Sequence, residues 1–161
     1  LGLQCMVIEA ARNLAGIKDA NSAEFLPDSG THVIATMDDQ KDIVSGAGDM
    51  GGSMRLGLYK ATLTPGSIVA GVYGSNEISE RHRHRYEVNN LYVPKLEQAG
   101  MLISARTPTE DLPEIMEIPG HPWFIGVQFH PEFTSTPRDG HPLFTSYIRA
   151  ALTSQNKRKG A

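Results

Sequence analysis

An imidazole and a carboxylate stand two residues apart in the segment His130-Pro131-Glu132. The five residues before Gln128 are all apolar or glycine, and prolines bound the stretch, which predicts a buried strand over 123–128. A strand that ends beside His130 places a general base at the edge of a sheet, where open α/β sheets build their sites. Glu132 would orient one ring nitrogen and leave the other to take a proton from a nucleophile. The pair therefore predicts two members of a catalytic triad.

The only cysteine, Cys5, is a poor candidate for the third member. Apolar residues at helical spacing predict an amphipathic helix over 3–15, which Gly16 ends. Cys5 would lie inside this helix, whereas a nucleophile elbow holds its side chain on the strained turn before a helix. That turn falls at or just before Leu1. We expect Cys5 to be a small buried apolar residue, the usual state of a free cysteine.

The first four residues and the distant His-Pro-Glu segment together resemble the class I, or triad, glutamine amidotransferases. The elbow of that family reads Gly-X-Cys-X-Gly-X-Gln, and its last four positions match Leu1-Gly2-Leu3-Gln4. The resemblance implies that the nucleophilic cysteine immediately precedes Leu1 and lies outside this sequence. We therefore expect the 161-residue chain by itself to be inactive as a glutaminase.

Three further segments, 50–56, 80–90 and 134–144, narrow the resemblance to the glutaminase domains of CTP synthases, which aminate UTP with ammonia from glutamine. The most specific match is the run Arg-His-Arg-His-Arg-Tyr-Glu-Val-Asn, which begins at Arg81. It is followed later by Ser-Thr-Pro-Arg-Asp-Gly-His-Pro. The resemblance extends from Leu1 to about Leu152.

The resemblance also implies roles for individual residues. The glutamine-binding residues would be Leu1, Gly2, Leu3, Gln4, Glu24 and Arg85, with His130 as the base and Glu132 as its orienting partner. The backbone amide of Leu1 would form part of the oxyanion hole. Glu24 would bind the ammonium group of glutamine. Arg85 would bind the carboxylate, which matches a guanidinium well.

The same resemblance implies partners beyond this domain. We expect no cofactor here, because Mg²⁺ and ATP would bind a separate N-terminal synthetase domain of the parent chain. GTP would be an allosteric activator, sensed in part by residues 81–85. The parent would be a homotetramer.

Several alternatives stay open. The chain could belong to another class I amidotransferase or a γ-glutamyl hydrolase, or be a degenerate module that binds glutamine without cleaving it. A Gly-X-Cys before Leu1 would favour an enzyme. The run 81–85 could also be an exposed strand, with its arginines on one face and its two histidines on the other. Two histidines without cysteine pairs are too few for a structural zinc site, so we expect no metal. We expect His32, His121 and His141 to be structural.

Composition excludes several classes of protein. A net charge of −3 gives no reason to expect nucleic acid. The sequence contains no run of about 18 apolar residues for a membrane span. Its first residues lack the charged region of a signal peptide. A single cysteine suits a reducing compartment, so we expect a cytoplasmic protein.

The predicted fold is α/β, a three-layer open sheet with helices on both faces, whose N-terminal strands are missing from this chain. Residues 1–154 would be the C-terminal portion of the amidotransferase domain, and 155–161 a disordered polar tail. Expected strands are 32–37, 53–56, 58–63, 101–106, 114–118 and 123–128. After the helix 3–15 come a loop over 19–30, an exposed excursion over 38–49, and helices over about 90–98 and 141–152. The last helix would bury Leu143, Phe144, Tyr147, Ile148 and Ala151.

Overall fold

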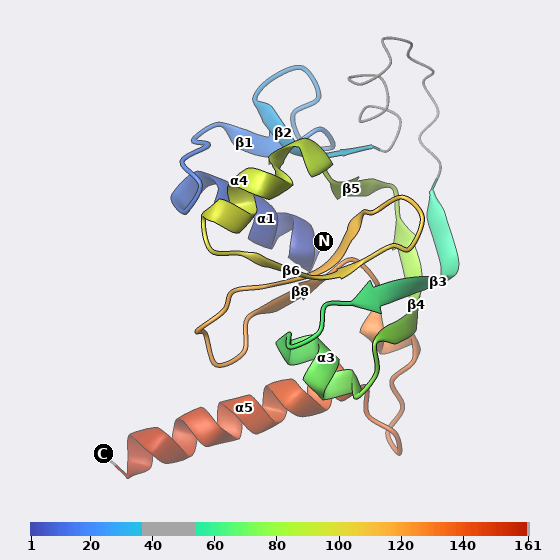
Figure 1. Ribbon diagram of the computed structural model, residues 1–161, viewed down its shortest axis with the longest axis vertical. Coiled ribbons are helices and arrows are strands. Elements are labelled where there is room, and N and C mark those ends of the chain that lie inside the picture. Colours follow the sequence, from blue (N-terminus) through green and yellow to red (C-terminus); the bar gives the residue numbers. More distant parts are fainter. Residues whose placement is uncertain (37–53, 161) are drawn as a thin grey trace.

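The computed structural model describes residues 1–36 and 54–160 (Figure 1). Its helices are α1 (Gly2–Asn13), α3 (Ile68–Tyr73), α4 (Val93–Gln98) and α5 (Pro142–Lys159), with 3₁₀ turns η1 (Asn90–Tyr92) and η2 (Pro131–Phe133). The strands are β1 (Ala20–Ser22), β2 (Thr31–Thr36), β3 (Arg55–Leu63), β4 (Glu77–His84), β5 (Tyr86–Val88), β6 (Leu102–Arg106), β7 (Pro113–Glu117) and β8 (Ile125–Val127). The prediction of a mixed α/β fold is confirmed.

The strands form two sheets. The larger has the order β4-β3-β6-β7-β8, and its neighbouring strands pair antiparallel. The smaller has the order β1-β2-β5, with β1 and β2 parallel. Only Arg85 separates β4 in the larger sheet from β5 in the smaller one. The side chain of Arg85 therefore lies at the junction of the two sheets.

The apolar core has two parts, one on each side of β7. Leu3, Met6 and Val7 of α1 pack in the first part with Met116, while Leu63 and Leu143 pack in the second with Ile115. Successive residues of a strand face opposite sides of its sheet, so the adjacent pair Ile115 and Met116 places buried cores on both faces. In Figure 1, α1 and α4 lie beside one part of the larger sheet, and α3 and α5 lie at the other end.

Several predicted elements are confirmed. The first helix is α1, and Gly16 beyond it has a φ of +68°, a conformation that glycine adopts without strain. The strands expected at 32–37, 101–106 and 114–118 are present as β2, β6 and β7, apart from small differences at their ends. The helix expected over about 90–98 begins as η1 and continues as α4.

Other predictions are wrong. Residues 53–56 and 58–63 were expected as separate strands, but β3 is continuous through Gly57, which pairs with His82 at a φ of +107°. The loop 19–30 contains β1, and the short helix α3 was not predicted. The side chain of Ser67 caps α3 by accepting a hydrogen bond from the Ala70 amide. This N-cap is a local sequence signal for the start of a short helix. The excursion 38–49 lies outside the described residues.

The last helix differs most from its prediction. Of the five residues expected to be buried, only Leu143 is, and Phe144, Tyr147 and Ile148 are 43–56% exposed. Figure 1 shows why, because α5 meets the rest of the described chain only near its beginning. The sequence also predicts a disordered tail from residue 155, whereas the helix continues to Lys159. Three basic residues in the last turn favour that extension, since they oppose the negative end of the helix dipole.

Helix α1 packs tightly against the larger sheet at Gly126 of β8. A Cβ atom placed there would lie 2.7 Å from Met6 Sδ and 3.1 Å from Leu3 Cα. Gly126 is therefore required for α1 to lie directly on β8. The described chain contains no helix long and apolar enough to cross a bilayer.

This contact yields a first prediction. Gly126→Ala should destabilise the protein by about 1–3 kcal/mol, because an added methyl group must push α1 away from β8. Gly71→Ala is the matched control, since nothing lies within 4 Å of its Cβ position in α3. It should be neutral or stabilising by up to about 1 kcal/mol. Urea unfolding measures both, and equal stability of the two variants would contradict the packing argument.

Candidate active site

Two chain segments meet at the candidate site. Leu1 lies at the amino end of α1, where its carbonyl accepts the first helical hydrogen bond from the Cys5 amide at 3.0 Å. His130 follows β8 after Gln128 and Phe129, and its backbone amide donates to the Arg81 carbonyl of β4 at 2.9 Å. The packing of α1 on β8 at Gly126 therefore fixes Leu1 relative to His130.

The predicted pair of His130 and Glu132 is formed in the structure. Nδ1 of His130 lies 2.6 Å from Oε1 of Glu132, and the ring stacks on Phe133 with centroids 5.1 Å apart. A carboxylate only accepts hydrogen bonds, so Nδ1 carries the hydrogen and Nε2 has the free lone pair. Partial burial acts to raise the pKa of Glu132, but the hydrogen bond from His130 holds this pKa below its ordinary value. The geometry therefore suits His130 as a general base.

A cavity of about 550 Å³ opens in front of His130. Its lining includes five of the residues that the sequence singled out, namely Leu1, Gln4, Glu24, Arg85 and His130. They come from the start of α1, the turn after β1, the β4–β5 junction and the end of β8. Gly2 and Leu3 do not line this cavity. We call it the polar cavity, and its content of an acid, an arginine and a base suits a small zwitterionic ligand.

Gln4 is held in a defined orientation at the wall of the polar cavity. Its Nε2 donates to the Tyr86 carbonyl at 3.0 Å and lies 3.4 Å from Oε1 of Gln128. Because that nitrogen is engaged within the protein, Oε1 of Gln4 is the atom left to accept from a ligand. Glu24 and Arg85 are exposed residues in the lining of the cavity.

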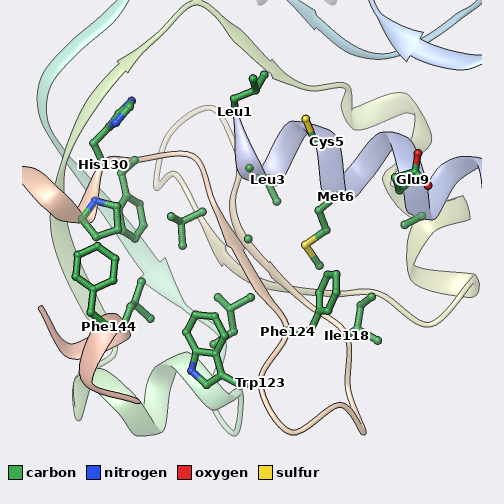
Figure 2. A pocket seen from close by; sticks show the side chains of 18 of the residues that line it. Leu1, Leu3, Cys5, Met6, Glu9, Ile118, Trp123, Phe124, His130 and Phe144 are labelled. Atoms are coloured by element: carbon green, nitrogen blue, oxygen red, sulfur yellow. The ribbon is translucent and has the colours of Figure 1, made fainter. Parts of the chain in front are cut away.

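A second cavity of about 790 Å³ lies beside the first and is mainly apolar. Gly2, Leu3 and Cys5 line it together with residues such as Trp123 and Phe144, and Leu1 and His130 border both cavities. Figure 2 shows Cys5 on α1 about one turn beyond Leu1. The prediction that Cys5 is buried is wrong, because its thiol lies on the outer face of α1 and is free.

A buried charged cluster behind the polar cavity was not predicted. Arg55 of β3 pairs closely with Glu114 of β7 and lies 3.5 Å from Glu87 of β5. His82 and His84 of β4 lie against the same carboxylates. Burial raises the pKa of Glu87 and Glu114, although Arg55 acts to lower it. Burial, together with the charge of Arg55, lowers the pKa of His82 to about 3 and of His84 to about 4.

Sequence alone gave little sign of this cluster. Its residues are far apart along the chain, and each looks like an ordinary surface charge. The alternation along 81–85 was the one available signal, and it is confirmed, because Arg81 and Arg83 are exposed while His82 is buried. Among the described residues, no group of three or more His, Cys, Asp or Glu is arranged to hold a metal ion.

The remaining histidines have structural partners. His141 is buried, lies 2.8 Å from Oε1 of Glu80 and accepts the Leu143 amide at the start of α5. His32 contacts the carbonyls of Leu26 and Ser29. These contacts account for both residues without a role in the site.

Comparison with known proteins agrees with this arrangement. The family model "Glutamine amidotransferase class-I" matches residues 1–150, so the chain belongs to the class I glutamine amidotransferases. It is 42% identical in sequence to the Trypanosoma brucei CTPS glutaminase domain solved with bound acivicin, with a TM-score of 0.84. That match covers 94% of this chain and 58% of the other, so the chain spans little more than half of that relative.

A second solved structure is much less similar. It is a Thermoplasma acidophilum protein assigned to a GMP synthase, 20% identical to this chain with a TM-score of 0.49. The match covers 66% of this chain and 49% of the other, and so distant a likeness supports no statement about the site.

The His130–Glu132 geometry yields a second prediction. His130→Ala should raise the pKa of Glu132, because the carboxylate loses the hydrogen bond that favours its ionised form. Glu110 is the internal control, since its low pKa comes chiefly from the Thr109 hydroxyl and should stay unchanged. Carboxyl carbon shifts followed by NMR during an acid titration measure both groups. An unchanged Glu132 would mean that the pair is not formed in solution.

Proposed function

We propose that this chain is part of the glutaminase domain of a CTP synthase, and that the intact domain hydrolyses glutamine to glutamate and ammonia. The observation that carries the proposal is the polar cavity, which collects Leu1, Gln4, Glu24, Arg85 and His130. Similarity to the trypanosomal CTPS glutaminase domain supports the choice within the family.

Glutamine would bind by its charged groups at the mouth of the polar cavity. Arg85 would hold the α-carboxylate through a two-pronged hydrogen bond, and Glu24 would hold the α-ammonium. These two contacts would direct the side-chain amide toward the amino end of α1 and His130. Oε1 of Gln4 would accept from a donor of the substrate.

The reaction requires a nucleophile that we assign to a cysteine directly before Leu1 in the intact protein. Its thiolate would attack the amide carbon, and the resulting oxyanion would accept a hydrogen bond from the Leu1 amide. His130, having taken the thiol proton on Nε2 when the thiolate formed, would donate that proton to the departing nitrogen as the carbon–nitrogen bond breaks. His130 would then take a proton from water, which cleaves the γ-glutamyl thioester and restores the thiolate.

The proposal extends to the parent protein. Ammonia would pass to an N-terminal synthetase domain that uses ATP and Mg²⁺ to aminate UTP. GTP would activate the glutaminase reaction, and the parent would assemble as a homotetramer. These properties follow from the resemblance to CTP synthases.

A third prediction separates the site from the synthetase reaction. In the intact parent, His130→Ala should reduce glutamine-dependent CTP formation by about 100-fold or more, since it removes the general base. Amination by added ammonia should change little, because free ammonia bypasses the glutaminase site. CTP formation measured with each nitrogen source decides the matter, and equal loss of both activities would make His130 a structural residue.

A fourth prediction tests the assignment of Arg85. Arg85→Ala should raise KM for glutamine roughly 10- to 100-fold with a smaller change in kcat, because a charge-assisted hydrogen bond present in both ground and transition states is lost. Arg85→Lys should recover only part of this, since an ammonium makes no two-pronged contact. Arg81→Ala, on β4 shortly before Arg85 but outside the polar cavity, is the control. Assays without GTP should show an unchanged KM for it.

If Arg81→Ala raised KM as much as Arg85→Ala, the effect would reflect the general positive charge of the strand. Arg85 would then lose its role as a specific ligand.

A further inference from the structure

Four polar groups form a continuous chain from the buried cluster to the wall of the polar cavity. Oε2 of Glu114 lies 3.5 Å from Nε2 of His82, whose Nδ1 lies 2.7 Å from Nε2 of His84. Nδ1 of His84 then lies 3.2 Å from the Tyr86 carbonyl and 3.3 Å from Oε1 of Glu87. His84 itself lines the polar cavity.

The direction of this chain follows from its end at Tyr86. A carbonyl and a carboxylate both accept hydrogen bonds, so Nδ1 of His84 must carry a hydrogen. A neutral imidazole has one donor and one acceptor nitrogen, so Nε2 of His84 accepts from Nδ1 of His82. Nε2 of His82 is therefore also an acceptor, and it faces the Glu114 carboxyl.

Two acceptors cannot bind each other, so a hydrogen is needed between His82 and Glu114. Oε2 of Glu114 is buried and has no hydrogen-bond partner among the described residues, so a hydrogen there completes the chain. The alternative is a doubly protonated His82, which burial and Arg55 oppose by lowering the pKa of His82. Burial favours the neutral form of Glu114.

Hydrogen-bond donors surround the carboxyl group of Glu87, whereas Oε2 of Glu114 faces an acceptor nitrogen of His82. Its Oε2 accepts from Nε2 of Gln128 at 2.9 Å, and its Oε1 lies beside Arg55 and the hydrogen-bearing nitrogen of His84. These neighbours are donors and favour the ionised form of Glu87, whereas burial raises its pKa to about 8. One negative charge on the pair of carboxyls balances the positive charge of Arg55, which limits the cost of burying the cluster.

We propose that Glu114, His82 and His84 form a proton-holding chain that positions the wall of the glutamine cavity, with the hydrogen of Glu114 fixing His84 as a donor to the Tyr86 carbonyl. These three are positioning residues, since they act through Tyr86 and Gln4. This inference depends on the proposed function in one respect, which is that glutamine is taken as the ligand of the polar cavity.

Loss of the hydrogen from Glu114 would reverse the chain. His82 would then donate to Glu114 through Nε2, and His84 would donate to His82, leaving a lone pair on Nδ1 of His84. That lone pair would face the carbonyl of Tyr86 and the carboxylate of Glu87 and repel both. The same carbonyl accepts from Nε2 of Gln4 at 3.0 Å.

The wall that this repulsion would displace carries the ligand contacts. Tyr86 directly follows Arg85 in the chain, and its carbonyl holds Gln4 in orientation. Deprotonation of Glu114 should therefore weaken glutamine binding, so that KM rises as the pH rises through the titration of Glu114. A single proton limits the rise to about tenfold per pH unit.

Other charged groups near the chain set where it titrates. Arg55 on β3 favours ionisation of Glu114, whereas Glu110 before β7 opposes it, and the charge of Glu114 in turn opposes ionisation of Glu87 on β5. His130, after β8, acts on both chain histidines. A histidine that gained a proton would therefore meet positive charge from several elements, which keeps both rings neutral.

The decisive variant is Glu114→Gln in the intact parent. An amide in this place keeps an oxygen for Arg55 and presents a permanent N–H to His82, which imitates the protonated carboxyl. The alkaline rise in KM for glutamine should disappear, with kcat close to that of the wild type. Glu117→Gln is the matched control, because this buried carboxylate on the same strand accepts the Ile68 and Val69 amides and does not touch the chain. It should keep the wild-type pH profile.

An NMR measurement tests the chain without relying on glutamine turnover. Long-range nitrogen–proton spectra of the imidazoles should place the hydrogen on Nδ1 in both His82 and His84 at a mildly acidic pH, below the titration of Glu114. Hydrogens on Nε2 in both rings would overturn the proposal, and so would an alkaline KM profile unchanged by Glu114→Gln. Absence of glutamine hydrolysis in the parent would count against the proposed function alone, since the NMR result stands independently.

Discussion

The site depends on the direct contact between α1 and β8 at Gly126. Because Gly126 has no side chain, Leu3 and Met6 occupy the space that a Cβ atom would take. Helix α1 therefore packs closer to β8 than any other residue type at this position would allow. Leu1 begins that helix and His130 follows that strand. One packing contact therefore sets the distance between the amino end of a helix, where anions are stabilised, and the candidate general base.

The substrate side of the site depends on a different constraint, the single-residue crossing between the two sheets. β4 ends at His84 and β5 begins at Tyr86, so Arg85 is held from both sides by strand pairing while its side chain points to solvent. Directly behind this junction lies the cluster of Arg55, Glu87 and Glu114. Buried charges cost stability unless they are paired, and the cluster keeps its charges in balance immediately behind an exposed arginine.

Sequence reasoning worked best where a pattern was local. The spacing of apolar residues predicted α1, and the His-Pro-Glu segment predicted the observed pairing of His130 and Glu132. The polar cavity contains most of the residues carried over from the family resemblance, although their roles stay predictions. The wrong predictions also have a physical cause. The apolar stripe of α5 and the thiol of Cys5 were expected to be buried, yet the thiol and the stripe beyond Leu143 are exposed, because an apolar pattern shows which face could be covered and not what covers it.

The buried cluster could not have been predicted for a related reason. Arg55, Glu87 and Glu114 meet only because β3, β5 and β7 converge, and no spacing rule joins residues so far apart in the chain. The alternation of residues 81–85 showed that His82 and His84 share a face, but not which carboxylates they would meet. Tertiary structure alone reveals that His82 and His84 lie against Glu114 and Glu87, and that His84 also lines the polar cavity.

The central claim is that the amino end of α1 and His130 enclose the reacting amide of glutamine. The most direct test is to quench the intact parent with acid during glutamine turnover and locate the γ-glutamyl thioester by peptide mass spectrometry. The account predicts a modified cysteine joined directly to Leu1. A γ-glutamyl group on Cys5, whose thiol borders the apolar cavity, would contradict it.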